Sequence, residues 1–124
     1  MLTPVTPDFE AHLRGLLPGA AFPAETTGFF EEPRGRWQGQ GLVVAPGSVD
    51  EVAAVVTACA AAKVGIVPHG GGTGLVAGQV APEGPAPVVL SLSRMAAIRE
   101  VLPDENVAVA EAGAVLADIQ AAAR

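Results

Sequence analysis

A glycine-rich segment constrains the fold of this chain more than any other feature of its sequence. The segment reads His69-Gly70-Gly71-Gly72-Thr73-Gly74 and directly follows the apolar run Ile66-Val67-Pro68. Because glycine has no side chain, successive backbone N–H groups can converge on one point, and such an arrangement favours an anion such as a phosphate group. Four glycines in five residues after an apolar strand therefore predict a phosphate-binding loop rather than a plain turn.

Two common phosphate-binding motifs do not account for this segment. A Walker A loop ends in Gly-Lys-Ser/Thr, but the single lysine, Lys63, precedes the loop. Residues 72–77 match the dinucleotide-binding pattern G-x-G-x-x-G/A, but that motif must open a helix. Residues 75–87 contain too many glycines and prolines to supply that helix, and no acidic residue follows the next expected strand at Leu92. The six-residue match is therefore weak evidence for a dinucleotide-binding fold.

Local patterns predict the other elements of the chain. Apolar runs bounded by glycine or proline predict strands at residues 42–45, 66–68 and 88–92, and a turn composition at 103–106 predicts a hairpin of residues 98–102 and 107–110. Helical spacing predicts helices at residues 6–17, 48–65 and 114–123. In the second helix, Ser48 and Glu51 form a capping-box pattern, and Gly65 is expected to end it.

Composition excludes several classes of protein. With 124 residues, of which 50% are hydrophobic, the chain is expected to form one domain with a core built mainly from Ala, Val and Leu. The net charge of −6 argues against nucleic acid and anionic membranes as partners, because both are bound by basic surfaces. One cysteine and two histidines give no basis for a disulfide framework or for a metal site within this chain.

The sequence contains no recognisable targeting or membrane segment. Residues 1–10 lack the basic and apolar regions of a signal peptide, and the most apolar stretch, residues 52–67, is too short for a membrane span. A cytoplasmic protein without an integral membrane segment is therefore expected. Charged residues make up only 16% of the chain, so part of its surface is expected to be apolar and available for self-association.

Three segments of the chain, in this order and spacing, resemble a known family. Residues 44–52, 65–74 and 89–95 are similar to the PCMH-type FAD-binding domain of the vanillyl-alcohol-oxidase flavoproteins. The resemblance is strongest to the FAD-linked D-2-hydroxy-acid dehydrogenases, which act on D-lactate, glycolate or D-2-hydroxyglutarate. Their loop commonly reads Gly-Gly-Asn-Thr-Gly-Leu-Val-Gly-Gly, whereas this chain has Gly72 for the asparagine and Ala77 for one glycine. Residues 32–37 and 106–113 also resemble that subgroup.

The resemblance implies an α+β fold. Residues 41–124 would form the first subdomain of the FAD-binding domain, a small mixed sheet with flanking helices, together with the beginning of the second. Residues 1–40 would form an N-terminal helix and an irregular lead-in. The later parts of such an enzyme, including its substrate domain, have no counterpart in the chain. The last expected helix also lacks a stop signal, so we expect a truncated piece of a larger flavoenzyme.

The resemblance also implies a set of cofactor-binding residues. The glycine-rich loop would hold the FAD pyrophosphate through backbone N–H groups, and the turn at residues 112–113 would lie close to the cofactor. In some relatives a loop histidine attaches FAD covalently, but His69 does not occupy that position, so non-covalent FAD is expected. For His69 itself, a phosphate or flavin contact and an ordinary loop role remain equally open. The full set is Pro68, His69, Gly70, Gly71, Gly72, Thr73, Gly74, Leu75, Gly78, Ala112 and Gly113.

The activity implied for the intact enzyme is oxidation of a D-2-hydroxy acid to a 2-oxo acid, with hydride passing to the flavin. A quinone, a cytochrome, an electron-transfer flavoprotein or oxygen would accept the electrons. No catalytic base and no metal ligand is assigned within residues 1–124, so the chain alone is expected to be inactive. Two alternatives stay open, namely a non-redox nucleotide- or phosphate-binding domain and an incomplete fragment without activity.

Several other residues have both a functional and a structural interpretation. Arg34 and Arg36 could contact a substrate carboxylate or a further domain, or lie in a solvated loop. Trp37 is expected to anchor packing, and Cys59 to be a buried small hydrophobic residue. Glu111 could bind a ribose hydroxyl, although a strand-end carboxylate is the simpler interpretation.

Overall fold

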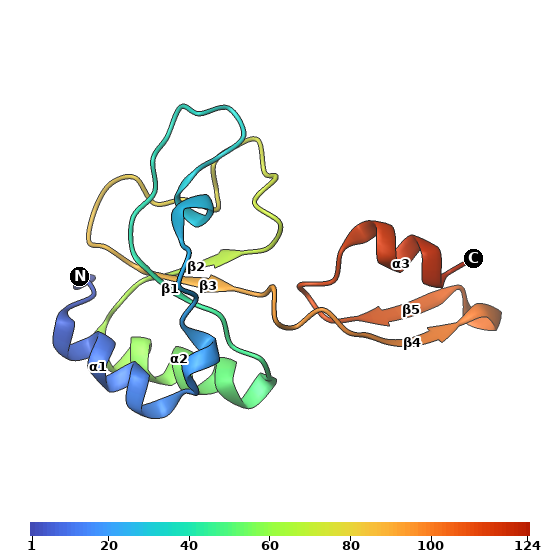
Figure 1. Ribbon diagram of the computed structural model, residues 1–124, viewed down its shortest axis with the longest axis horizontal. Coiled ribbons are helices and arrows are strands. Elements are labelled where there is room, and N and C mark those ends of the chain that lie inside the picture. Colours follow the sequence, from blue (N-terminus) through green and yellow to red (C-terminus); the bar gives the residue numbers. More distant parts are fainter.

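The computed structural model describes residues 1–124 and shows two lobes (Figure 1). The larger lobe contains helices α1 (Pro7–Leu16) and α2 (Val49–Ala62) and strands β1 (Leu42–Val44), β2 (Ile66–His69) and β3 (Val88–Ser91). The smaller lobe contains strands β4 (Ile98–Leu102) and β5 (Val107–Ala110) and helix α3 (Leu116–Ala122). Short 3-10 turns lie at Gly19–Ala21, Thr27–Phe30 and Pro103–Glu105.

The three strands of the larger lobe form a parallel sheet in the order β1-β3-β2. The central strand β3 is buried along its whole length, as expected for the middle strand of a parallel sheet. Strands β4 and β5 pair antiparallel in a separate two-stranded sheet. The expected α+β class is therefore confirmed, but the parallel and antiparallel strands lie in two sheets rather than in one mixed sheet.

Both ends of α2 differ in detail from the prediction. The Ser48 hydroxyl accepts from the backbone N–H of Glu51 at 3.2 Å, as expected. The Glu51 carboxylate, however, accepts from the N–H of Gly47 rather than from that of Ser48. At the other end, Lys63 adopts the left-handed conformation at φ 58°, so the helix ends before Gly65.

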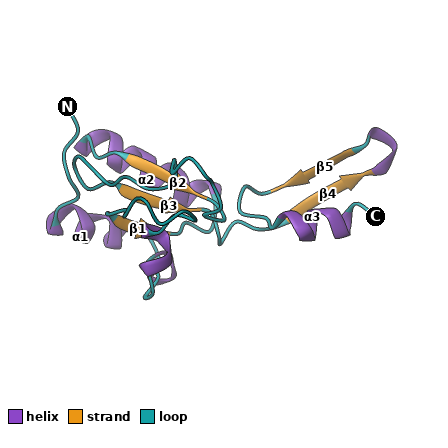
Figure 2. Ribbon diagram, turned by 90° about the horizontal axis from the view of Figure 1, so that it is seen from above, coloured by secondary structure: helices purple, strands orange, loops and turns teal.

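The hydrophobic core lies between the parallel sheet and the two helices that cover one of its faces (Figures 1 and 2). It is built mostly from Val, Leu and Ala, as the composition predicts. Cys59 is buried within it, and this burial raises the pKa of its thiol. The cluster consists of Phe9, Leu13, Leu17, Ala21, Val44, Val55, Ala58, Cys59, Val64, Val88 and Leu90.

The smaller lobe has no comparable core. No residue after Met95 is buried. Helix α3 begins at Leu116 rather than at residue 114, and the apolar face predicted for it is exposed to solvent, since Leu116 is 68% exposed.

None of the helices has the length and hydropathy needed to cross a membrane.

Candidate functional site

A cleft of about 510 Å³ is lined by the loop that follows β2, by residues after β3 and by residues that lead into α3. Parallel strands place their carboxyl ends at one edge, and open α/β sheets bind ligands just beyond that edge. Here β2 leads directly into the glycine-rich loop, and β3 leads towards the smaller lobe. The cleft is lined by Gly70, Gly71, Thr73, Ser93, Ala96, Ala112, Gly113, Ala114, Val115 and Leu116.

The glycine-rich loop presents a run of unused hydrogen-bond donors. The backbone N–H groups of residues 70–74 donate no hydrogen bond within the protein. No atom lies within 4 Å of where a side chain of Gly70 would begin, and only the Thr73 methyl group comes that near to Gly71. A ligand can therefore approach this backbone closely. Free amides of this kind favour an anionic group.

Gln79 holds the loop from its other side. Its side-chain amide donates to the carbonyl oxygens of Gly72 at 3.2 Å and of Gly74 at 2.9 Å. In a trans peptide the C=O and N–H bonds point in opposite directions. These two hydrogen bonds therefore turn the N–H groups of Thr73 and Leu75 away from Gln79. Sequence reasoning missed Gln79, since its position in a Pro- and Gly-rich stretch gives no signal of this role.

The buried ring of His69 packs against Gly72 of the glycine-rich loop. It is 6% exposed, and its ring packs edge-on against Phe29 with centroids 4.9 Å apart. Its Nδ1 lies 3.1 Å from the carbonyl oxygen of Gly70, and its buried Nε2 has no hydrogen-bond partner. Gly72 passes over the ring at φ 73°, and a Cβ there would lie 3.1 Å from Cε1 and Nε2. The structure thus places His69 under the loop, and not among the residues that line the cleft.

Gly113 forms the joint between the two lobes. Its N–H donates to the carbonyl oxygen of Met95 at 2.8 Å. A Cβ at this position would overlap the carbonyl oxygen of Leu92 and lie 2.8 Å from that of Met95. Only glycine allows this close backbone contact. The turn at residues 112–113 is therefore fixed against the residues that follow β3, and it lines the same cleft as the glycine-rich loop.

Comparison with known families identifies the domain. The sequence model of a family described as "FAD binding domain" matches residues 41–124, well over half of the chain. The chain belongs to this FAD-binding domain family.

Two curated relatives of this FAD-binding domain are both named D-2-hydroxyglutarate dehydrogenase. The protein from Xanthomonas citri pv. viticola is 45% identical over 74 residues, which cover 59% of this chain and 15% of the relative. The protein from Stutzerimonas stutzeri is 41% identical over 78 residues, which cover 63% of this chain and 16% of the relative. The matched region is thus a small part of either enzyme.

Solved structures show the same fold at low sequence identity. Alkyldihydroxyacetonephosphate synthase superposes with a TM-score of 0.77 at 21% identity, over 98% of this chain and 25% of that one. p-Cresol methylhydroxylase superposes with a TM-score of 0.69 at 17% identity, over 98% of this chain and 26% of that one. The predicted membership of the vanillyl-alcohol-oxidase-type fold is therefore confirmed.

The cleft of this FAD-binding domain contains part of the predicted site. Gly70, Gly71, Thr73, Ala112 and Gly113 line it, whereas Pro68, His69, Gly72, Gly74, Leu75 and Gly78 do not. Cofactor contact by these residues stays a prediction. Prediction from the sequence missed the remaining lining residues, which lie between β3 and β4 and at the start of α3, namely Ser93, Ala96, Ala114, Val115 and Leu116.

The free amides and open space at Gly70 and Gly71 fit a pyrophosphate, which is anionic and needs close backbone approach. No lysine or arginine lines the cleft, so an anion there would be bound by neutral backbone N–H groups. The shape and the donors of the cleft therefore fit the cofactor that the family implies.

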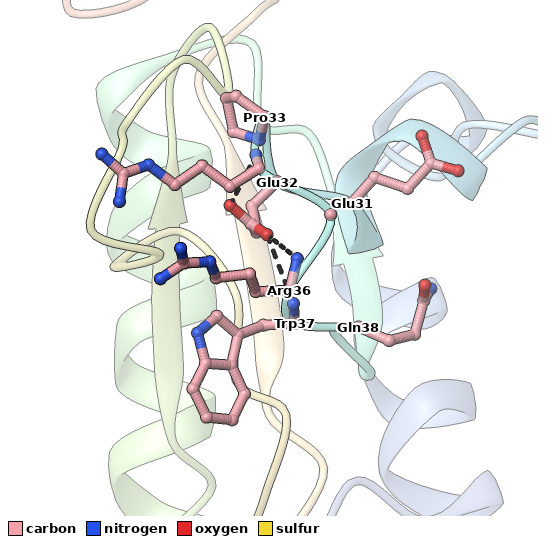
Figure 3. Close-up of a pocket in the computed structure, with 8 residues that line it drawn as sticks. Glu31, Glu32, Pro33, Arg36, Trp37 and Gln38 are labelled. Carbon is pink, nitrogen blue, oxygen red and sulfur yellow. Dashed lines mark hydrogen bonds between the residues drawn. The ribbon is translucent and has the colours of Figure 1, made fainter.

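A second recess, of about 480 Å³, is formed by residues 31–38 (Figure 3). At its centre, the buried carboxylate of Glu32 accepts from the backbone N–H groups of Arg34 at 2.9 Å, Trp37 at 3.2 Å and Arg36. Burial opposes ionisation of Glu32, but these hydrogen bonds outweigh it and lower its pKa below the ordinary value of 4.5. Glu32 was not predicted as a site residue. Trp37 does not anchor packing as expected, since it is 50% exposed.

Glu111 has a structural role at the base of the hairpin. Its carboxylate accepts from the N–H of Ala97 at 3.0 Å and from the Arg99 guanidinium at 3.0 Å. The hydrogen bond from Ala97, followed by that from Arg99, lowers the pKa of Glu111. Both carboxylate oxygens are therefore engaged, which favours the strand-end interpretation over a ribose contact.

Proposed function

We propose that this chain binds FAD non-covalently and forms part of a flavin-dependent oxidoreductase that converts a D-2-hydroxy acid into a 2-oxo acid. The observation that supports this most strongly is the run of free backbone N–H groups at residues 70–74, because Gly70, Gly71 and Thr73 of this run line a cleft that Gly113 also lines. The names of the curated relatives support the substrate class. A quinone, a cytochrome, an electron-transfer flavoprotein or oxygen would accept the electrons.

The residues of this chain bind and orient the cofactor. Gly70, Gly71 and Thr73 are the loop residues that line the cleft, so their N–H groups would donate to the pyrophosphate, and the Thr73 hydroxyl would add a donor from the same wall. Gln79 and His69 hold the loop from the side away from the ligand. Bound FAD supplies a ring that accepts hydride from the substrate carbon. The base that removes the hydroxyl proton is not assigned to this chain.

Non-covalent attachment is supported by the cleft lining. The lining offers no histidine, cysteine or tyrosine, and the His69 ring is buried against Phe29. We expect acid precipitation of the flavin-loaded protein to release all the flavin into solution. Flavin that stays with the precipitated chain would contradict this part of the proposal.

The decisive experiment is an FAD titration of the chain and of its Gly70→Val variant, followed by flavin absorbance near ~450 nm. Gly70 faces open space, so valine can fold there but fills the approach to the free amides. We expect at least a roughly tenfold loss of FAD affinity with an unchanged circular dichroism spectrum, because several hydrogen bonds to a charged group would be disturbed.

Gly28→Val is the matched control, because Gly28 also has no neighbour within 4 Å but lies in a 3-10 turn away from the cleft lining. It should leave FAD affinity unchanged. Equal affinities of the Gly70→Val variant and the unmodified chain would refute the loop assignment. Binding of ADP without binding of FAD would favour the non-redox alternative instead.

A further inference from the structure

The recess formed by residues 31–38 contains two arginines without partners. The ion pairs of the structure engage Arg14, Arg94 and Arg99, and none engages Arg34 or Arg36. Nor does either guanidinium donate a hydrogen bond to a protein group. Both arginines are exposed to solvent, and in a chain with a net charge of −6 they place two cationic groups beside a recess.

Glu32 forms no ion pair with either arginine, although the charge of Arg34 helps to lower the pKa of Glu32. Its carboxylate is the acidic group nearest to them in sequence within the loop, but its oxygens accept from three backbone N–H groups instead. These bonds hold residues 32–37 in a tight turn. In Figure 3 the side chains of Arg36 and Trp37 extend to one side of this turn, whereas Glu31 and Gln38 extend to the other. Glu32 therefore acts as a positioning residue for the cationic and aromatic side.

That side faces the end of the glycine-rich segment. A smaller recess of about 230 Å³ is lined by Glu32, Arg34, Arg36 and Trp37 together with Leu75, Val76 and Ala77. Leu75 directly follows Gly74, so the arginines lie next to the loop assigned to the cofactor. Glu83 lies in an adjoining recess beside Trp37 but forms no ion pair with either arginine.

The chemistry of this recess indicates its ligand. Guanidinium groups bind carboxylates through paired N–H donors in one plane. The exposed Trp37 ring and the apolar Leu75 and Val76 side chains supply contact for a short carbon chain beside the charged end. A small organic acid contains both a carboxylate and a short carbon chain.

We propose that this recess is a carboxylate-binding site in which Arg34 and Arg36 hold a carboxylate of the hydroxy-acid substrate. The inference rests on the proposed function, since it takes the bound acid to be the substrate. Arg34 and Arg36 then determine specificity for acids, and the recess is separate from the cleft that holds the pyrophosphate. An acid with two carboxylates binds more tightly than one with a single carboxylate, because two cationic groups are present.

Trp37 makes the test specific, because it is the single tryptophan and the chain has no tyrosine. The experiment is a titration of the FAD-free chain with D-2-hydroxyglutarate and with D-lactate at physiological ionic strength, followed by tryptophan fluorescence. We expect a saturable change for both acids, with tighter binding of D-2-hydroxyglutarate. Arg34→Gln and Arg36→Gln should each weaken binding at least about tenfold, because each removes charge-assisted hydrogen bonds.

Arg124→Gln is the control, since it removes the same charge from the last residue of the chain, outside the recess. It should leave the titration unchanged. Inorganic phosphate that binds as tightly as D-2-hydroxyglutarate would overturn the assignment to carboxylates, and so would equal responses of the unmodified chain and the Arg34→Gln and Arg36→Gln variants.

FAD affinity separates this inference from the proposed function. Arg34→Gln and Arg36→Gln should leave FAD affinity unchanged, whereas Gly70→Val lowers it. If the arginine variants lose FAD affinity instead, the arginines serve the cofactor, and the carboxylate site is refuted while the proposed function stands. If the unmodified chain binds the acids but not FAD, the proposed function fails, and the recess is then a carboxylate-binding site whose acid is not a substrate.

Discussion

At the scale of single residues, the Glu32 carboxylate makes the stability of the fold depend on pH. Its pKa in the folded chain lies below the ordinary value of 4.5, because three backbone N–H groups favour the carboxylate despite its burial. A carboxyl group with a lowered folded pKa stabilises the fold above its unfolded pKa, and this contribution is lost as the pH falls through the folded value. Glu32 should therefore stabilise the chain at neutral pH but not in acid.

We expect Glu32→Gln to lower the free energy of unfolding at pH 7, because one carboxylate oxygen becomes an NH2 group facing backbone donors. The difference from the unmodified chain should shrink as the pH falls below 4.5. Urea unfolding at a series of pH values measures both effects. Glu31→Gln is the control, since Glu31 extends to the other side of the loop (Figure 3). A destabilisation by Glu32→Gln that stays constant down to pH 3 would contradict the role given to the charge.

Gly113 has the tightest backbone contact among the glycines. Gly113→Ala should lower the free energy of unfolding by more than about 2 kcal/mol, because the added Cβ overlaps the carbonyl of Leu92 and forces the two lobes apart. It should also weaken FAD binding, since the turn forms one wall of the cleft. Thermal unfolding and an FAD titration measure the two effects.

Gly15→Ala, in the exposed part of α1, should be neutral or slightly stabilising, because Gly15 has no neighbour within 4 Å and alanine favours the helix. If Gly113→Ala were as stable as this control, the close contact at the joint would not exist in solution.

The residues of the candidate site were predictable to different extents. The glycine-rich loop and the turn at residues 112–113 were predictable because their composition limits the backbone directly. Gln79 and Glu32 were not, because an amide or carboxylate that binds backbone groups has no characteristic neighbours in the sequence. The burial of His69 under Gly72 depends on Phe29, which lies 40 residues earlier in the chain. Sequence patterns of nearby residues cannot report such a contact.

At the scale of elements, capping side chains define where the helices of the larger lobe begin. Thr6 caps α1 and Ser48 caps α2, and each hydroxyl accepts from the backbone N–H three residues later, at 3.1 Å and 3.2 Å. These signals are local, so sequence reasoning placed both starts correctly. The end of α2 was placed too late, because Lys63 takes up the left-handed conformation that glycine usually supplies.

Ser48→Ala should lower the free energy of unfolding by about 1 kcal/mol, because the N–H of Glu51 loses its partner at the start of α2. Thr57→Ala, at an exposed position within the same helix, is the control and should be neutral or slightly stabilising, since alanine has the higher helix propensity. Urea unfolding compares the two variants. Equal effects of both substitutions would show that the Ser48 cap contributes nothing.

At the scale of the whole molecule, the two lobes differ in how much apolar surface they bury. The larger lobe holds the core, whereas the smaller lobe exposes the apolar side chains of Val107, Val109, Val115 and Leu116. A two-stranded hairpin is marginally stable by itself. The sequence predicted the hairpin and its helix, but not that they would stand apart from the parallel sheet (Figure 2), because pairing between distant strands is not encoded in local pattern.

This exposed surface should make the chain associate with itself as its concentration rises. Leu116→Glu should weaken that association, because it replaces the most exposed of these four apolar side chains with a charged one. Sedimentation velocity over a range of concentrations measures the effect. Glu100→Gln, at an exposed position of β4, is the control and should leave association unchanged. A chain that remains monomeric at all concentrations would contradict the prediction.

The cleft at the joint has a thermodynamic consequence. Its walls come from both lobes, so an occupant that contacts both walls is bound by the folded arrangement and by no unfolded one. Ligand binding in the cleft is then thermodynamically linked both to folding and to the angle between the two lobes. At a free ligand concentration of 100 times its Kd, this linkage adds about 2.7 kcal/mol to the free energy of unfolding. The melting temperature of this small chain therefore serves as a binding assay that needs no chromophore.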